Sequence, residues 1–240
     1  KVMLGQKLKD LGYGTGLYPE ARYYAVKAPV FSFEKLTDVD TGLGPEMKST
    51  GEVLGLAETY PQALLKAFKG AGLKVPKRGS RVIVTVKDED KAEMVGIARG
   101  FEEMGIEIYA TSGTCDALTE AGIECHRVNR VSQSHPNILD MIASGTVDMI
   151  INTPTKGRKH DSDGFKIRRS AVEHSVTCVT AIDTARAILT VRHAEPQRGS
   201  YPHRHSRRSD HHLPGPVWAR GDALTDLPAS YGTFCFWIVS

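Results

Sequence analysis

Cysteines, long apolar runs and net charge are all scarce in this sequence, and each scarcity excludes a class of protein. The four cysteines (Cys115, Cys125, Cys178 and Cys235) show neither the spacing of a metal site nor that of a disulfide framework. No apolar run approaches the ~20 residues that cross a bilayer, and no basic-then-apolar leader opens the chain. The net charge of +3 is too small to predict nucleic-acid binding by itself. We therefore expect a cytoplasmic protein with no membrane contact and no metal site.

Lysine is missing altogether from the last part of the chain. The composition changes near residue 192, beyond which lie both tryptophans and five of the nine histidines. Residues 193–240 show no helical or strand periodicity, and such a segment buries too little apolar surface to offset its chain entropy. We expect a disordered tail, although its clustered histidines could bind a metal ion and the closing "FCFWIV" is prone to aggregate.

Between Arg81 and Leu189, strand-like and helix-like segments alternate. Strands are expected at 81–86, 107–111, 124–128, 147–152 and 176–180, and helices at 88–104, 114–121, 136–144, 164–174 and 184–189. Each connection is long enough for a crossover between parallel strands. The pattern predicts an α/β fold with a five-stranded parallel, doubly wound sheet.

Polar residues lie between the end of each of several predicted strands and the helix that follows it. Open α/β sheets bind ligands beyond the carboxyl ends of their strands, and the groups there are Lys91, Thr111-Ser112-Gly113-Thr114, Arg130 and Asn152-Thr153. They favour a phosphate site, helped by the free N–H groups of a helix N-terminus. The alternative is purely structural: Thr114 would cap the helix and Gly113 would form the turn.

The first 76 residues follow a different pattern. We expect a short helix ending at Gly12, a strand broken by Pro29 or a strand pair, a glycine-rich loop over 41–55, and a helix from Thr59 to Gly72. These elements are too few to bury the apolar stretch 25–33. The segment and the start at Lys1 predict a piece of a larger protein, joined by a basic linker at 74–79.

Several strings occur in a familiar order. "VKAPVFSFEKL" and "LGPEMKSTGEVLG" precede "ATSGT", "VNRV" and "IINT…DGFKIRRSAVE". Over residues 1–190 the chain resembles the C-terminal end of the large chain of carbamoyl-phosphate synthetase. The resemblance implies that 1–76 is an incomplete α+β remnant of the second ATP-grasp unit, and that 77–192 is a methylglyoxal-synthase-like regulatory domain.

The resemblance also assigns a pocket for the phosphate of an allosteric effector. The family's positions correspond to Lys91, Thr111, Thr114, Arg130 and Asn152, with Ser112, Gly113 and Thr153 in the same turns. The loop "SQSHPNI" departs from the family pattern, and Pro154 replaces a second threonine, so Thr153 or Thr155 would have to serve.

As the resemblance implies, the full protein is an ATP-dependent, glutamine-hydrolysing ligase of arginine and pyrimidine synthesis. It would use ATP with Mg or Mn and associate with a glutaminase small chain and other large-chain copies. This piece would contain no catalytic residues, metal or cofactor. Uridine monophosphate (UMP) is the leading effector, while inosine monophosphate, phosphoribosyl pyrophosphate and N-acetylglutamate remain alternatives.

Two other functions remain open. A methylglyoxal-synthase-like lyase would need a carboxylate base beside the phosphate, and Asp88 is the candidate. A basic nucleic-acid module would use the cationic cluster of Lys156, Arg158, Lys159, Lys166, Arg168, Arg169, Arg204, Arg207 and Arg208. Interspersed aspartates and the lack of any aromatic residue but Phe165 favour a solvated loop, or a domain–domain contact in the full synthetase, for that cluster.

Overall fold

The computed structural model describes residues 1–12, 22–33, 47–154, 162–193 and 238–239. Short 3-10 helices cover η1 (Val2–Leu4), η2 (Leu8–Leu11) and η4 (Asp88–Asp90). The strands are β1 (Tyr24–Val30), β2 (Gly51–Ala57), β3 (Arg81–Thr85), β4 (Glu107–Ala110), β5 (His126–Arg127), β6 (Met149–Asn152), β7 (Thr177–Val179) and β8 (Ile238–Val239). The helices are α1 (Tyr60–Gly70), α2 (Lys91–Glu103), α3 (Ser112–Glu120), α4 (Ile138–Ala143), α5 (Asp163–Glu173) and α6 (Ile182–His193).

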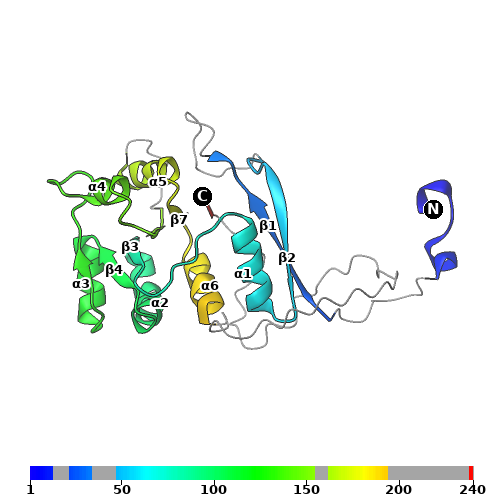
Figure 1. Cartoon of the computed structure of the whole chain (residues 1–240), viewed down its shortest axis with the longest axis horizontal. Coiled ribbons are helices and arrows are strands. Elements are labelled where there is room, and N and C mark those ends of the chain that lie inside the picture. Colours follow the sequence, from blue (N-terminus) through cyan, green and yellow to red (C-terminus); the bar gives the residue numbers. More distant parts are fainter. Residues whose placement is uncertain (13–21, 34–46, 155–161, 194–237, 240) are drawn as a thin grey trace.

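The larger sheet has the strand order β5-β4-β3-β6-β7-β8. Its first five strands are parallel, which confirms the predicted architecture (Figure 1). The chain starts in the middle at β3, winds outward to β5, and then returns to β6 on the other side of β3. The strand order therefore switches between β3 and β6, where open α/β sheets form their ligand crevice.

Successive side chains of a strand point to opposite faces of the sheet, and here each face is covered by an apolar layer. In β3, Val82 and Val84 face one core, which α2, α3 and α6 cover, whereas Ile83 faces a second core under α4 and α5. All three of these side chains are fully buried. Because strand side chains alternate with period two, a strand covered on both faces is apolar at successive positions, as "VIV" in the middle of β3 is.

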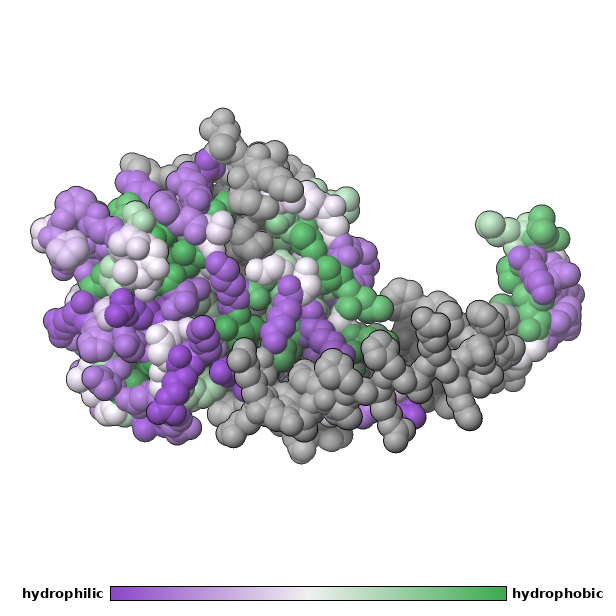
Figure 2. Space-filling view, in the orientation of Figure 1, coloured by the Kyte–Doolittle hydropathy of each residue, from purple (hydrophilic) through white to green (hydrophobic). Residues whose placement is uncertain are grey.

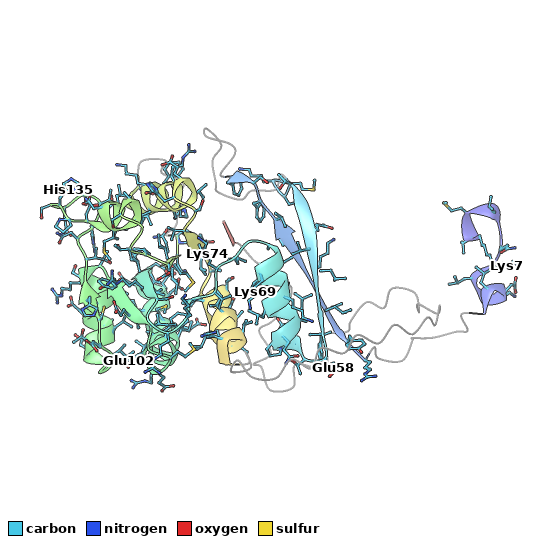
Figure 3. All side chains as sticks on the ribbon, in the orientation of Figure 1. Lys7, Glu58, Lys69, Lys74, Glu102 and His135 are labelled. Atoms are coloured by element: carbon cyan, nitrogen blue, oxygen red, sulfur yellow. The ribbon has the colours of Figure 1, made fainter. Side chains whose placement is uncertain are left out.

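Helix α1 extends the first core beyond the sheet. It packs between α6 and the antiparallel ribbon β1–β2 (Figure 1). Leu64 and Phe68 are each 1% exposed and belong to the same cluster as Val82 and Val84. After α1, the chain is tied to β7 where the Lys74 N–H donates to Thr177 Oγ1 at 3.1 Å (Figure 3). The predicted boundary at residues 76/77 is therefore crossed by one apolar core.

The amino-terminal elements differ from the sequence prediction in three ways. Residues 2–11 form two 3-10 helices instead of one helix, with Gly12 in the left-handed region as expected. Pro29 does not break its strand, because a ribbon of two strands leaves an edge on which a missing N–H costs no ladder bond. The predicted loop over 41–55 is wrong for residues 51–55, which belong to β2 (Gly51–Ala57), and residues 41–46 lie outside the described part.

Two helix starts also differ from prediction. Helix α3 begins at Ser112, so Thr111 is its N-cap residue and Thr114 lies inside the first turn. Gly113 is helical, and its φ is not among the positive values of the chain. Helix α4 begins at Ile138, because Asn137 forms a capping box with Asp140 and excludes Pro136 from the helix.

The predicted disordered tail is wrong at its end, since Ile238–Val239 form β8 against the edge of β7. These residues come from the apolar stretch "FCFWIV", whose β-branched members suit a strand. Residues 194–237, with the clustered histidines and both tryptophans, lie outside the described residues.

Exposed apolar surface is concentrated at the amino-terminal end. In the described part, the large hydrophobic side chains that are exposed all lie before residue 57, and include Met3, Met47, Leu54 and Leu56. Figure 2 shows hydrophobic surface over the ribbon and over the first residues. Within the described ranges, no helix combines the length and apolar character that a membrane span requires.

Candidate anion-binding site

The residues singled out by the sequence lie along the carboxyl edge of the parallel strands. Strand pairing places Val84 beside Ala110 and Thr85 beside Asn152, so β3, β4 and β6 end at the same level. Thr111 follows β4 directly, and Asn152 is the last residue of β6. The sheet thereby brings the residues that follow β3, β4 and β6, which are distant in sequence, to one polar edge.

The start of α3 supplies donors that the protein itself leaves unused. Thr111 occupies the N-cap position but makes no side-chain capping bond. Its carbonyl accepts from the N–H groups of Thr114 at 2.9 Å and Cys115 at 2.8 Å. Within the described residues, the N–H groups of Ser112 and Gly113 have no partner, as expected for a first helical turn.

Two nearly buried hydroxyls belong to the same turn. Thr111 is 7% exposed and Thr114 is 3% exposed. Neither hydroxyl forms a hydrogen bond with a described residue. Since every buried side-chain N or O atom in the described part has a partner, both oxygens must reach the protein surface. These two hydroxyls, on almost fully buried residues, therefore remain available to a ligand or to water.

Lys91 brings a positive charge to this turn. A Cβ atom on Gly113 would lie 3.2 Å from Lys91 Nζ, so glycine allows the ammonium group to approach the start of α3. Lys91 Nζ also contacts Asp88 Oδ1 at 2.6 Å. The hydrogen bond and the charge of Lys91, with a smaller contribution from Arg130, lower the pKa of the Asp88 carboxyl.

Arg130 lies near the same carboxylate from the loop after β5. Its residue is exposed, and its N–H donates to Gln133 Oε1 at 2.8 Å. Its charge acts on Asp88, which links the β5 loop electrostatically to Lys91. Lys91, Gly113, Asp88 and Arg130 therefore form one group around the amino end of α3.

At the end of β6 the polar groups are fixed by neighbours. Asn152 is 4% exposed, and its Oδ1 accepts from Arg168 Nη1 at 2.6 Å. Thr153 is 6% exposed, and its Oγ1 accepts from the Lys87 N–H at 3.0 Å. Because Lys87 immediately precedes Asp88, Thr153 joins β6 to the loop that presents Lys91.

The structure thus brings the eight predicted residues to one edge, and adds residues that the prediction omitted. Arg168 was assigned only to the cationic cluster, and Gly164 had no assigned role. The spacing from Gly164 to Arg168 is i, i+4, which places both on one helix face; that spacing, after a strand ending in Asn152, was the available signal.

The loop 132–137, which contains most of the string "SQSHPNI", is organised by its own contacts. His135 Nδ1 contacts Asp140 Oδ2 at 2.6 Å, and the Asn129 amide donates to the Ser134 carbonyl at 2.9 Å. Figure 3 places His135 at the outer end of this loop. His135 is therefore engaged with α4.

The described residues contain no group of three or more histidine, cysteine or carboxylate side chains that could hold a metal ion. The proposed cationic cluster is partly committed to internal contacts, since Arg168 contacts Asn152 and Arg169 forms a 2.7 Å ion pair with Glu173. Lys156, Arg158 and Lys159, together with the arginines beyond residue 193, lie outside the described part.

A family model for the MGS-like domain matches residues 93–180, which agrees with the parallel, doubly wound sheet. The carbamoyl phosphate synthase large chain of Lachnoclostridium phytofermentans is 53% identical over 190 residues, covering 79% of this chain and 18% of that protein. The corresponding protein of Agathobacter rectalis is 50% identical over 189 residues, covering 78% and 18%. The chain therefore spans about a fifth of the length of these curated relatives.

Two solved structures are also similar. Methylglyoxal synthase from Elizabethkingia anophelis NUHP1 gives a TM-score of 0.41 at 23% identity, over 51% of this chain and 81% of that one. The crystal structure of ForH gives a TM-score of 0.33 at 19% identity, over 46% and 77%.

Proposed function

We propose, from the premise that this chain is a relative of the carbamoyl phosphate synthase large chains, that it is their C-terminal regulatory part and binds a phosphate-bearing effector. The ligand's phosphate would lie on the Thr111–Thr114 turn beside Lys91. Arg130, Asn152 and Thr153 would contact the same ligand from the adjoining strand ends.

One observation carries this proposal. The hydroxyls of Thr111 and Thr114 have no partner among the described residues, although both residues are almost completely buried. They adjoin two free backbone N–H groups and the Lys91 ammonium. Hydroxyls, N–H groups and a cation at a helix N-terminus are the donors that bind phosphate.

The proposal extends to the longer protein. There the chain would regulate an ATP-dependent, glutamine-hydrolysing ligase of the pyrimidine and arginine pathways in the cytoplasm, with a glutaminase small chain and other large-chain copies as partners. An upstream ATP-grasp unit would bind ATP and Mg or Mn. Since coupling between two sites is typically ~1–3 kcal/mol, the effector would change the affinity of the ligase for its substrate by about five- to 150-fold.

The state of Asp88 favours effector binding over lyase chemistry. A general base works best when its pKa lies near the working pH. Lys91 instead holds the pKa of Asp88 below its usual value, which makes this carboxylate a weaker base. The Lys91 ammonium of the same ion pair is the group that would attract an effector's phosphate, in competition with Asp88.

Calorimetric titration with UMP, inosine monophosphate, phosphoribosyl pyrophosphate, N-acetylglutamate and inorganic phosphate tests the proposal. We expect a phosphate compound to bind the wild type and to bind Lys91→Ala about tenfold or more weakly, since a charge-assisted hydrogen bond contributes ~1.5–3 kcal/mol. Lys77→Ala removes the same charge from an exposed position in the linker before β3 and should bind normally. Failure of every phosphate compound to bind the wild type would overturn the proposal.

A further inference from the structure

The side chain of Arg168 contacts the candidate site by a hydrogen bond to Asn152. It lies in α5, and its Nη1 donates to Asn152 Oδ1 at 2.6 Å. Asn152 is 4% exposed and ends β6 at the switch in strand order. The contact therefore joins the helix that follows β6 to the polar edge described above.

This contact fixes the orientation of the Asn152 amide. A guanidinium group can only donate hydrogen bonds, so the amide oxygen must face Arg168 and the NH2 group must point away from it. The NH2 group forms no hydrogen bond with a described residue. Because no buried side-chain N or O atom in the described part lacks a partner, this nitrogen reaches the surface. Asn152 thus presents donors, and not its acceptor, to the outside.

Gly164 leaves room for the Arg168–Asn152 contact. A Cβ atom at this position would lie 3.1 Å from Arg168 Nη1 and 3.3 Å from Asn152 Oδ1. Both distances are tighter than ordinary van der Waals contact, so a side chain here would press on the hydrogen bond itself. A larger residue at position 164 would have to displace the Arg168 guanidinium or the Asn152 amide by a few tenths of an ångström.

Thr153, like Asn152, uses its side-chain oxygen to accept a hydrogen bond from the protein. Its Oγ1 accepts the Lys87 N–H at 3.0 Å, so the hydroxyl proton is directed elsewhere. At the end of β6, the protein therefore occupies the acceptor atoms of two adjacent residues with its own donors. The hydroxyl proton of Thr153 and the NH2 group of Asn152 are the donors that remain for a ligand.

We propose that Arg168 is a positioning residue that fixes the Asn152 amide with its NH2 group toward the ligand, so that this edge selects oxygen acceptors such as phosphate or carbonyl oxygens. The selection of ligand rests on the proposed function; the orientation of the amide does not. Arg168 acts through Asn152 and need not contact the ligand.

A double-mutant cycle with UMP and inorganic phosphate tests the dependence on Asn152. Arg168→Met keeps the length of the side chain and removes its donors, and should weaken binding about tenfold. In the Asn152→Ala background the same substitution should have no further effect, because non-additivity identifies residues that act as a unit. Arg168→Lys restores one donor and should recover part of the affinity. Arg169→Met, with the same loss of charge one residue away, is the control.

The side-chain amide resonance of Asn152 gives a second measurement that needs no ligand. In the free protein, Arg168→Met should shift this signal, and Arg169→Met should not; the signal is assigned by its absence in Asn152→Ala. Additive losses in the cycle would show that Arg168 contacts the ligand directly and would refute the positioning role. An unshifted Asn152 resonance in Arg168→Met would also refute the positioning role, whether or not the wild type binds a phosphate compound. Absence of wild-type binding with a shifted resonance would refute only the selection of ligand.

Discussion

Thr111 and Thr114 lie in the same helical turn, and neither hydroxyl caps the helix. Thr111 holds the N-cap position, where a threonine hydroxyl usually accepts from a backbone N–H, yet it makes no such bond. Thr114 is the third residue of α3, inside the first turn, and therefore does not occupy the N-cap position. Since neither hydroxyl stabilises α3, the structural explanation for this turn fails, and a substitution at Thr114 can be interpreted without a capping contribution.

Thr114→Val should separate binding from folding. Valine keeps the branched shape of a side chain that is 3% exposed and removes only the hydroxyl. We expect a ten- to hundredfold loss of affinity for a phosphate effector, since a hydrogen bond to a charged group contributes ~1.5–3 kcal/mol. Calorimetry measures the affinity and a thermal melt verifies the fold, with Thr114→Ser as the variant that keeps the hydroxyl. Equal binding by both variants would exclude Thr114 from the site.

Asp88→Asn should strengthen phosphate binding. The Asp88 carboxylate contacts Lys91 Nζ at 2.6 Å, so an incoming phosphate must compete with it for that ammonium. An amide carries no charge and competes less, and we expect several-fold tighter binding of inorganic phosphate, most clearly at low salt. Glu89→Gln removes a neighbouring charge that is paired instead with Lys87 and should change binding less. A weaker affinity in Asp88→Asn would mean that the carboxylate supports the ligand.

At the scale of elements, the periodic segments were predictable and the boundaries of several helices were not. The apolar strands β3, β4 and β6 and the helices α2 and α5 lie where the pattern placed them, because burial on both sheet faces leaves a strong sequence signal. The strand at Gly51–Ala57 was missed because it has two glycines and one covered face. Gly55 is required there, since a Cβ would lie 2.0 Å from the Ala63 carbonyl oxygen of α1.

The candidate site was predictable to the level of residue types, but not to their orientation. Position at a strand end suffices to predict that Thr111 and Asn152 share one edge. The direction of the Asn152 amide depends on Arg168, which lies 16 residues away, and the charge of Lys91 is partly offset by Asp88. Such contacts depend on how α5 and η4 dock, which the sequence pattern does not specify.

Helix α4 offers a test of pH dependence at the scale of an element. The Asp140 carboxylate accepts from the Asn137 N–H at 2.7 Å. That bond, and then His135, lower the pKa of Asp140 from its ordinary 3.8. A carboxyl whose folded pKa is lowered stabilises the fold above its unfolded pKa, and this contribution is lost as the pH falls through the folded value.

Asp140→Asn should therefore be less stable than the wild type at neutral pH and down to about the ordinary pKa of aspartate, ~4. Below the folded pKa of Asp140 the two proteins should converge, because the wild-type carboxyl is then protonated as well. Urea denaturation across that range measures the difference, and Asp116→Asn, at a carboxylate paired with Arg127, is a comparison outside α4. A constant difference at every pH would contradict the capping role of the charge.

At the scale of the whole molecule, the apolar surface is unevenly distributed. One core runs from the sheet through α6 to α1 and the inner face of the β1–β2 ribbon. The outer face of the ribbon leaves Leu54 67% exposed and Leu56 48% exposed. Helix α1 thus packs into the same core as the parallel sheet, although it comes before the linker that the sequence suggested as a boundary.

Leu64→Ala and Leu54→Ala provide a matched pair to test this arrangement. The chemical change is identical, but Leu64 is 1% exposed in α1 and Leu54 is 67% exposed in β2. Removing a buried leucine side chain costs about 2–5 kcal/mol, whereas an exposed leucine loses little. If one cooperative core spans residues 22–193, the Leu64→Ala loss should also appear as faster hydrogen exchange of the Val84 and Ile151 amides in β3 and β6, which lie beyond the linker. Leu54→Ala should leave those amides unchanged. Unaltered exchange in β3 and β6 of Leu64→Ala would place an energetic boundary near residue 76, and residues 1–76 would then fold as a unit of their own.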